Sequence, residues 1–238
     1  MRGCRWFGCH SLHFLVLCIL FCSVFICTPD NGKSQSSSSN ARVGWGEKYH
    51  RCGLQGHLQY EIFAKAMTGH RSWAFSKKDL LTIIDFSQPS YKKRLYVLDL
   101  NKEKLLYRTY VAHGRETGLT YAREFSNIPN SHQSSLGFYR TAETYRGKHG
   151  YSLRLDGLES QINDLARQRA IVMHAADYAR ESFVQEYGRL GRSLGCPALP
   201  PELSQEIISR IKDGSCVFVY ADDSEYLTSS QVFASPSG

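Results

Sequence analysis

The chain has 238 residues, of which 42% are hydrophobic and 21% are charged, as expected for a globular protein with one domain of ordinary size. Its formal net charge of +7 suits an anionic partner, although a basic enzyme without a polyanionic partner fits equally well. The sequence lacks a basic helix, a zinc knuckle and an RNA-binding signature, so we expect no nucleic-acid partner.

The N-terminus has the pattern of an export signal. Arg2 and Arg5 precede an apolar run from Phe14 to Cys27, which would be about 21 Å long as a helix and therefore short for a full membrane span. Residues 1–28 are predicted to be a signal peptide or a membrane anchor, and the cleavage site is left open. We expect an exported protein of the periplasm or cell envelope that contacts the inner membrane only through this segment.

Residues 29–55, which include the stretch NGKSQSSSSNARVG at 31–44, are predicted to be a Ser-rich linker before a catalytic domain at 56–238. Periodic apolar residues predict a first helix at 58–67 and a long helix at 200–214, which begins with proline. Strand-like runs follow one another at 80–86, 94–100, 104–113, 136–147, 151–157, 169–174 and 216–221. The pattern predicts a β-rich domain of consecutive antiparallel strands with at least one packed α-helix and a frayed tail.

Five of the eight cysteines lie in the N-terminal segment, which leaves Cys52, Cys196 and Cys216 for the domain. No C-x-x-C pair occurs among these three, so we expect no structural zinc site. No cofactor is expected either. Cys216 opens the apolar run CVFVYA and is predicted to be a core residue, and a Cys52–Cys216 disulfide is left open.

The stretch GRSLGCPAL at 191–199 offers two nucleophiles, Ser193 and Cys196. It fits the G-x-S-x-G elbow of α/β-hydrolases, but that fold requires a histidine after the serine and a helix directly after the motif. All nine histidines lie at or before His174, and Pro197 and Pro200 interrupt the following residues. These facts exclude Ser193 as an elbow nucleophile, and they exclude papain-like peptidases, in which cysteine precedes histidine.

A thiol nucleophile at Cys196 must take its base from upstream, and His174 ends a predicted strand 22 residues earlier. An imidazole beside a thiol raises the thiolate fraction or removes the proton during attack. Gly195 leaves the backbone free to turn, so that amides at 194–196 can converge on an oxyanion. The alternative interpretation is a structural turn around a buried cysteine.

IVMHAADY at 171–178 followed by GRSLGCPALP at 191–200 resembles the L,D-transpeptidase catalytic domain, in particular a divergent branch with a G-R-S-x-G-C-P-A signature. SSLGFY at 134–139 resembles the Thr-Pro-x-Gly-x-Phe strand of that family, and the resemblance covers about residues 80–221. It implies a β-sandwich with the cysteine and histidine at one end. It also implies action on peptidoglycan stem peptides outside the cytoplasm, without a metal.

The resemblance implies that Cys196 is the nucleophile and His174 the base, with the imidazole oriented by the carbonyl of Ala175. It further implies that Ser193 holds the loop by hydrogen bonding. The loop residues that would support the oxyanion are Ser193, Leu194 and Gly195, with Ala175 behind the base.

The sequence departs from the common family pattern at Leu194, where a second histidine is usual, and at Ala198, where arginine is frequent. Arg192 and His113 are candidates for substrate binding. Arg192 would replace the lost charge or be a surface cation, and His113 would line the same strand end or be structural. The remaining domain histidines are expected at the surface: His50, His57, His70, His132 and His149.

These features predict a peptidoglycan L,D-transpeptidase, a transferase of cell wall biogenesis that forms crosslinks through a thioester. Two alternatives stay open: an L,D-carboxypeptidase that releases D-alanine, and a non-catalytic envelope protein that binds peptidoglycan. A sortase is disfavoured, because it expects a wider His–Cys gap and an arginine soon after the cysteine.

Overall fold

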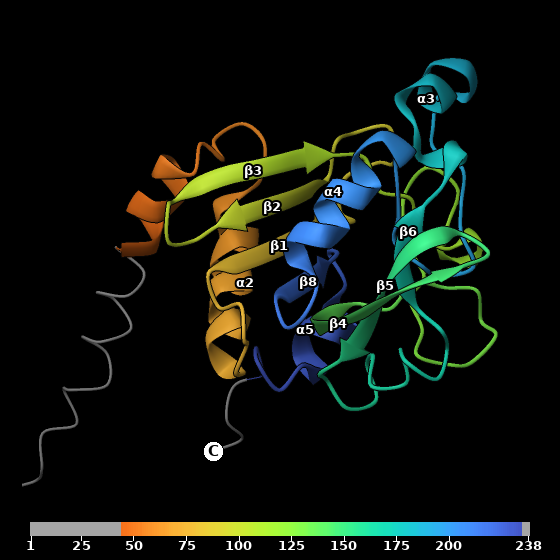
Figure 1. Cartoon of the computed structure of the whole chain (residues 1–238). Coiled ribbons are helices and arrows are strands. Elements are labelled where there is room, and N and C mark those ends of the chain that lie inside the picture. Colours follow the sequence, from red (N-terminus) through yellow and green to blue (C-terminus); the bar gives the residue numbers. More distant parts are fainter. Residues whose placement is uncertain (1–43, 235–238) are drawn as a thin grey trace, which may run out of the picture.

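The computed structural model describes residues 44–234 (Figure 1). The predicted signal or anchor at 1–28 and the linker up to residue 43 lie outside the described residues. Among the helices of the described part, none is long and apolar enough to cross a membrane.

Eight strands form one mixed sheet in the order β3-β2-β1-β8-β4-β5-β6-β7. The strands are β1 (Leu80–Asp85), β2 (Leu95–Asp99), β3 (Lys104–Thr109), β4 (Gly137–Gly147), β5 (Gly150–Gly157), β6 (Val172–Ala175), β7 (Ala198–Leu199) and β8 (Cys216–Tyr220). Ala112, just after β3, forms an antiparallel bridge to Ala198 in β7. The two edges of the sheet therefore meet, and the predicted β-rich domain is confirmed as a nearly closed barrel.

The neighbours β1–β2–β3 and β4–β5–β6 are antiparallel, as the turn signals between the runs predict. Two pairs are parallel: β1 with β8, and β6 with β7. In each parallel pair, a helix or a long loop separates the two strands in the sequence. The residues of a short turn therefore cannot predict these pairings.

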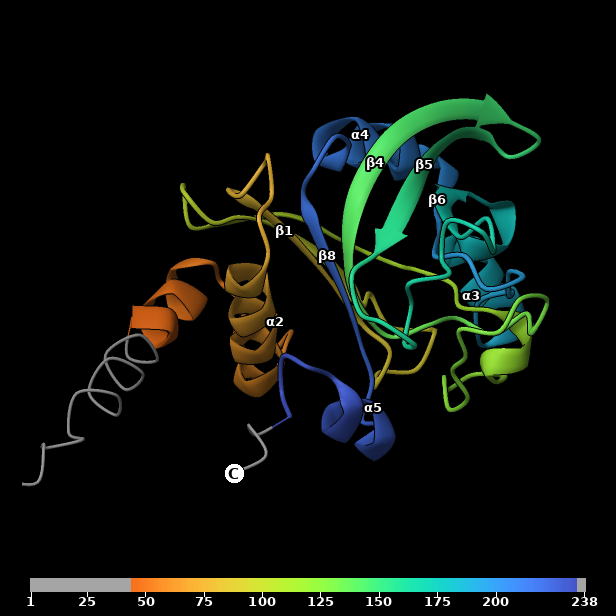
Figure 2. The same cartoon turned by 90° about the horizontal axis from the view of Figure 1, so that it is seen from below.

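Besides a helix at residues 44–51, the sheet is accompanied by α2 (Tyr60–Ser72), α3 (Glu181–Tyr187), α4 (Pro201–Ile211) and α5 (Ser224–Ser229). Helix α2 packs on β1 and β8, while α4 packs on β5 and β6 from the opposite side (Figures 1 and 2). The apolar face predicted for the second long helix is confirmed, because Ile207, Ile208 and Ile211 of α4 are fully buried.

The predicted linker at 29–55 is wrong for its last part. Residues 44–51 form a helix, and Trp45, Tyr49, Cys52 and Leu54 lie in the hydrophobic core. Trp45 and Tyr49 are four residues apart and so share a helix face, a pattern too short to stand out beside the polar stretch before it. The folded unit begins at least a dozen residues earlier than predicted.

The tail is ordered rather than frayed up to residue 234. Asp223 caps α5 by accepting a hydrogen bond from the Tyr226 amide at 2.8 Å. The Tyr226 hydroxyl donates to the buried carboxylate of Glu159 at 3.1 Å. This tertiary anchor, not helix propensity, holds the short α5 in place.

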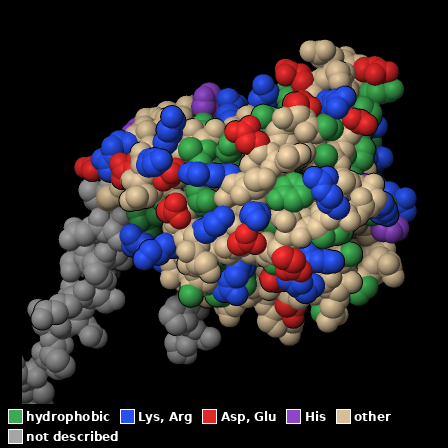
Figure 3. Space-filling model, viewed as in Figure 1, with side chains coloured by type: hydrophobic (Ala, Val, Ile, Leu, Met, Phe, Trp, Pro, Cys, Tyr) green, Lys and Arg blue, Asp and Glu red, His purple; other side chains and the backbone are tan. Residues whose placement is uncertain are grey.

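Cys216 lies in the core, as predicted. Cys52 is also buried, and both are free thiols. On the surface, Lys and Arg side chains are spread over the face shown in Figure 3 and are mixed there with Asp and Glu. That face therefore shows no single-sign patch of the kind that binds a polyanion.

Candidate active site

The segment 191–197, here called the nucleophile loop, connects the region after α3 to β7. Its backbone runs beside residues 113–115: the Ser193 amide donates to the His113 carbonyl at 2.9 Å, and the Arg115 amide donates to the Ser193 carbonyl at 2.8 Å. The Ser134 hydroxyl adds a third tie, since it donates to the Gly195 carbonyl at 3.0 Å and accepts from the Gly114 amide at 3.0 Å. The loop is thus fixed from two sides before any substrate arrives.

Ser193 organises the loop from within. Its hydroxyl donates to the Cys196 carbonyl at 2.6 Å and accepts from the Gly195 amide at 3.1 Å. Gly195 has φ +117°, and a Cβ atom there would lie 2.8 Å from the Gln133 carbonyl oxygen. Only glycine fits this turn.

The predicted oxyanion hole needs one correction. The Gly195 amide is already bonded to the Ser193 hydroxyl, so it is not free to bind an oxyanion. The amides of Leu194 and Cys196 make no hydrogen bond to any described residue. Two donors therefore remain of the three predicted. The Leu194 side chain is 54% exposed at the tip of the loop.

The Cys196 thiol lies at the end of β6. Its Sγ accepts from the Val172 amide at 3.4 Å and lies 3.7 Å from the Ala170 carbonyl. The pairing of His174 with Ala198 extends backwards to place Cys196 beside Val172. Val172, which Cys196 adjoins, and His174 are two residues apart on β6, a spacing of about 7 Å along the strand, and alternate residues of a strand share a face.

His174 is buried, and its Nδ1 lies 2.8 Å from the Ala175 carbonyl. That contact fixes the ring and directs Nε2 away from the backbone. Nε2 has no hydrogen-bond partner among residues 44–234, and the ring makes no direct hydrogen bond to the thiol. Such contacts are often loose in a site without substrate and tighten when it binds. The His174 ring stacks on His149, with centroids 4.3 Å apart.

Burial sets the charge state of the pair. It raises the pKa of the Cys196 thiol above its ordinary value, and the Val172 amide, Arg169 and Lys148 oppose that rise only in part. Burial likewise lowers the pKa of His174, and His149 and Lys148 lower it further. At neutral pH the resting site therefore holds a thiol and a neutral imidazole. Of the two routes to a nucleophile, removal of the proton during attack is the one that fits.

Arg169 is a neighbour of the thiol that the sequence pattern did not reveal. It precedes β6, and its guanidinium donates to the carbonyls of Ser126 at 2.6 Å and Gln133 at 2.6 Å. The Gln133 carbonyl in turn lies against Gly195. Arg169 thereby links the 126–135 segment to the nucleophile loop. No local motif identifies an arginine in this role, because its partners lie more than 30 residues away.

The contacts of His113 favour its structural alternative over substrate binding. It is fully buried, with Nδ1 2.7 Å from Nη2 of Arg94 and Nε2 donating to the Gly118 carbonyl at 3.1 Å. Burial, followed by the charge of Arg94, lowers its pKa to about 3. Both ring nitrogens are used inside the fold, so the structural alternative holds.

Arg192 is also tied to this region. Its guanidinium donates to the carbonyls of Arg115 at 2.9 Å and Gly118 at 3.4 Å. Both bonds come from Nη1 and hold the guanidinium beside the 115–118 segment. A role for Arg192 in binding the substrate carboxylate stays a prediction.

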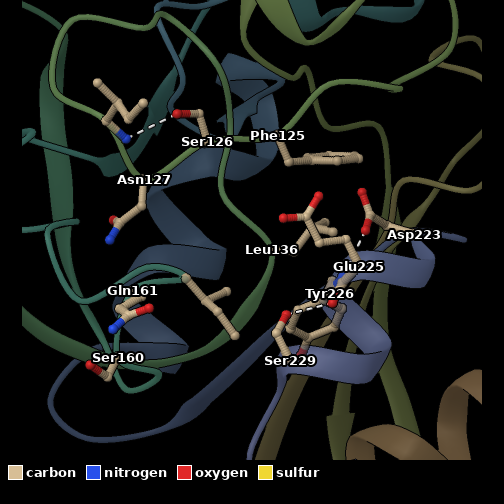
Figure 4. A pocket seen from close by; sticks show the side chains of 12 residues that line it. Phe125, Ser126, Asn127, Leu136, Ser160, Gln161, Asp223, Glu225, Tyr226 and Ser229 are labelled. Carbon is tan, nitrogen blue, oxygen red and sulfur yellow. Dashed lines mark hydrogen bonds between the residues drawn. The ribbon is translucent and has the colours of Figure 1, made fainter.

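No cluster of three or more His, Cys, Asp or Glu side chains in the described part of the chain is arranged to hold a metal ion. A cavity of about 370 Å³ lies between the 125–128 segment, residues 160–162 and α5 (Figure 4). Neither Cys196 nor His174 lines it. In Figure 4 Phe125, Asp223 and Glu225 lie on one side of the cavity and Asn127 and Gln161 on the other, and the cavity is separate from the thiol site.

Comparison with solved structures finds weak similarities to L,D-transpeptidases. That of Mycobacterium smegmatis is 13% identical with a TM-score of 0.39 and covers 60% of this chain and 59% of its own. That of Stackebrandtia nassauensis is 15% identical with a TM-score of 0.38 and covers 75% and 76%. The helical cell shape determining protein Pgp2 of Campylobacter jejuni is 13% identical with a TM-score of 0.40 and covers 63% and 49%.

The chain thus spans about three-fifths of the length of the first of these and about half of the last. No curated protein sequence matches it. The family model of the L,D-transpeptidase catalytic domain, however, matches residues 54–220, well over half of the chain and including the whole nucleophile loop. On that match, the chain belongs to the L,D-transpeptidase catalytic domain family.

Proposed function

We propose that the protein is a peptidoglycan L,D-transpeptidase that uses Cys196 as nucleophile and His174 as base. The observation that carries the proposal is the β6–β7 register, which brings the thiol and an imidazole with a free Nε2 to one end of the barrel. Family membership supports the substrate class, the stem peptides of peptidoglycan.

In the first half-reaction, Nε2 of His174 accepts the thiol proton as Sγ attacks the amide carbonyl carbon of the tetrapeptide's diaminoacyl residue. The free amides of Leu194 and Cys196 bind the resulting oxyanion. The C–N bond then breaks, and His174 returns the proton to the amine of the departing D-alanine. A thioester on Cys196 remains.

In the second half-reaction, the side-chain amine of another stem peptide attacks the thioester carbonyl. The amine loses a proton to His174, the C–S bond breaks, and the thiol is restored as the crosslink forms. If water attacks instead, the product is a tripeptide and the protein acts as a carboxypeptidase. The buried, neutral His174 suits either acceptor, because it must deprotonate the nucleophile in both cases.

This function requires contact with the cell wall. We propose that residues 1–28 direct export to the periplasm or cell envelope, and that the catalytic domain extends from about residue 44 rather than 56. The helix at 44–51, whose Trp45 and Tyr49 lie in the core, supports the earlier boundary.

The test uses the full chain, purified under reducing conditions, with a disaccharide-tetrapeptide and mass spectrometry of the products. We expect release of D-alanine by the native protein and none by Cys196→Ala. Crosslinked dimers identify a transpeptidase, and tripeptide alone identifies a carboxypeptidase. If the folded native protein binds the muropeptide without any product, it is a binding protein and the catalytic proposal is wrong.

A further inference from the structure

The turn of the β4–β5 hairpin consists of two residues. Gly147 pairs with Gly150, which leaves Lys148 and His149 as the loop. Gly150 has φ +73°, a conformation suited to a tight hairpin turn. Both Lys148 and His149 are exposed, so the turn presents two basic side chains at the end of a long ribbon.

This turn is distant in sequence from the nucleophile loop but lies beside His174. The hairpin arches past α4 toward β6 (Figure 2). At its end, the His149 ring stacks on the His174 ring with an interplanar angle of 23°. The sequence suggested a surface position for His149, and it is indeed exposed, but one face of its ring covers the proposed base. The stack keeps the turn beside His174, and Lys148 is the residue adjacent to His149 in that turn.

Lys148 has no ion-pair or hydrogen-bond partner among the described residues. The acidic residues of the same hairpin are committed elsewhere: Glu143 lies 2.9 Å from Arg167 and Asp156 lies 2.5 Å from it. Burial is the main cause of the raised pKa of Cys196 and of the lowered pKa of His174, and the charge of Lys148 adds a smaller, lowering contribution to each, as expected of a cation on the same side of the site. Within residues 44–234 no carboxylate forms an ion pair with Lys148, so its charge is unpaired there.

We propose that Lys148 binds the terminal carboxylate of the acyl donor, and that His149 holds the turn in place by stacking on His174. The inference rests on the proposed function and adds to it the group that recognises the leaving residue. In that residue the amine and the carboxylate are attached to the same carbon. A cation that binds the carboxylate must therefore lie beside the base that protonates the amine, and Lys148 has this position.

Electrostatic complementarity of this kind contributes most to selectivity between charged and neutral ligands. The subsite can therefore be detected without turnover, by comparing a negatively charged reagent with a neutral one. Iodoacetate and iodoacetamide alkylate a thiol by the same displacement of iodide and differ in that only iodoacetate carries a carboxylate. The ratio of their rates at Cys196 reports the positive charge near the thiol.

The first experiment measures this ratio at Cys196 by peptide mass spectrometry of the full chain. Lys148→Gln is expected to lower the iodoacetate-to-iodoacetamide ratio about threefold to fivefold, the size of one exposed ion pair. Lys102→Gln, at the exposed turn between β2 and β3, is the matched control and leaves the ratio unchanged. His149→Phe keeps the stack and the ratio, whereas His149→Ala releases the turn and lowers the ratio. An unchanged ratio in Lys148→Gln overturns the proposal.

The second experiment measures the Kd of Cys196→Ala for a stem tetrapeptide that ends in D-alanine and for one that ends in D-alaninamide. Adding Lys148→Gln is expected to weaken binding of the carboxylate peptide about threefold to fivefold and to leave the amide peptide unchanged. Equal weakening for both peptides overturns the subsite and leaves the proposed function standing. Failure to bind either peptide overturns the substrate class, and the carboxylate subsite with it.

Discussion

Two histidine-bearing segments lie on either side of β7, and they are used in opposite ways. Ala112, next to His113, bridges Ala198 from one side, and His174 pairs with Ala198 from the other. Both histidines are buried. His113 has both ring nitrogens bonded inside the fold, whereas His174 has one bonded to the Ala175 carbonyl and the other free.

The difference shows what separates a structural histidine from a reactive one in this barrel. Burial and a lowered pKa are common to both, so neither property identifies the base. The deciding feature is a second nitrogen without a partner, beside a thiol that contacts the same strand. The predictions below test this contrast, from the largest expected effect to the smallest.

The largest effect is expected at the free nitrogen. His174→Ala should lower kcat/KM for D-alanine release by about 10²- to 10⁴-fold, the usual contribution of a general base, and Cys196→Ala should abolish release. Both variants should unfold within about 1 kcal/mol of the native protein, because neither side chain donates to a buried charge. Thermal unfolding beside the activity assay checks this. A large loss of stability in Cys196→Ala would favour a structural thiol.

His113→Ala should have the reverse profile. It removes a hydrogen-bond partner from the fully buried guanidinium of Arg94 and should cost about 3 kcal/mol of unfolding free energy. The residual rate per folded molecule should stay close to that of the native protein. Urea unfolding with activity measured below the transition tests both parts. A catalytic defect without a stability defect would reverse the assignment of the two histidines.

The pH dependence of stability sharpens the same point. His113 has a pKa of about 3 in the folded chain and an ordinary value of 6.5 when unfolded. As the pH decreases below 6.5, the unfolded state binds the proton before the folded state does. The free energy of unfolding therefore decreases by at most about 1.4 kcal/mol for each pH unit of acidification. The contribution is fully present above pH 6.5. His113→Gln, measured by urea unfolding between pH 4 and 8, should have a shallower slope. An identical slope would mean that His113 is protonated in the fold.

The smallest effect is expected at Ser193, whose amide bonds the His113 carbonyl and whose hydroxyl bonds both ends of the thiol turn. Ser193→Ala should reduce kcat/KM about tenfold by loosening the nucleophile loop, with Ser193→Thr retaining most of the rate. Steady-state measurement of kcat/KM with the tetrapeptide substrate for each variant tests this prediction. Equal rates in Ser193→Ala and the native protein would show that the loop is held by its outer contacts alone.

Much of the barrel could be predicted from local pattern. The apolar runs of β1, β2 and β8 and the amphipathic pattern of α4 can be recognised from the residues of each element alone. The turn at Gly195 and the internal role of the Ser193 hydroxyl also follow from a short motif. These features depend on neighbours in sequence, which is the information that periodicity and turn chemistry contain.

What could not be predicted depends on partners far along the chain. YVAH at 110–113 and IVMH at 171–174 have the same pattern, yet only the tertiary contact with Arg94 makes His113 structural. Lys148 comes to the side of the site only because His149 in the same turn stacks on His174, and Arg169 is held in place by carbonyls of the 126–135 segment. The two-residue β7 is too short for any strand signal, and it is the element that joins the site.

The most direct test of the central claim is to trap the acyl-enzyme. The full chain, quenched in acid during turnover of a tetrapeptide stem, is digested and mapped by mass spectrometry. The account predicts a tripeptide-mass adduct, labile to hydroxylamine as a thioester is, on the peptide that contains Cys196 and on no other. D-alanine release without an adduct at Cys196, or with an adduct at a different residue, would contradict it.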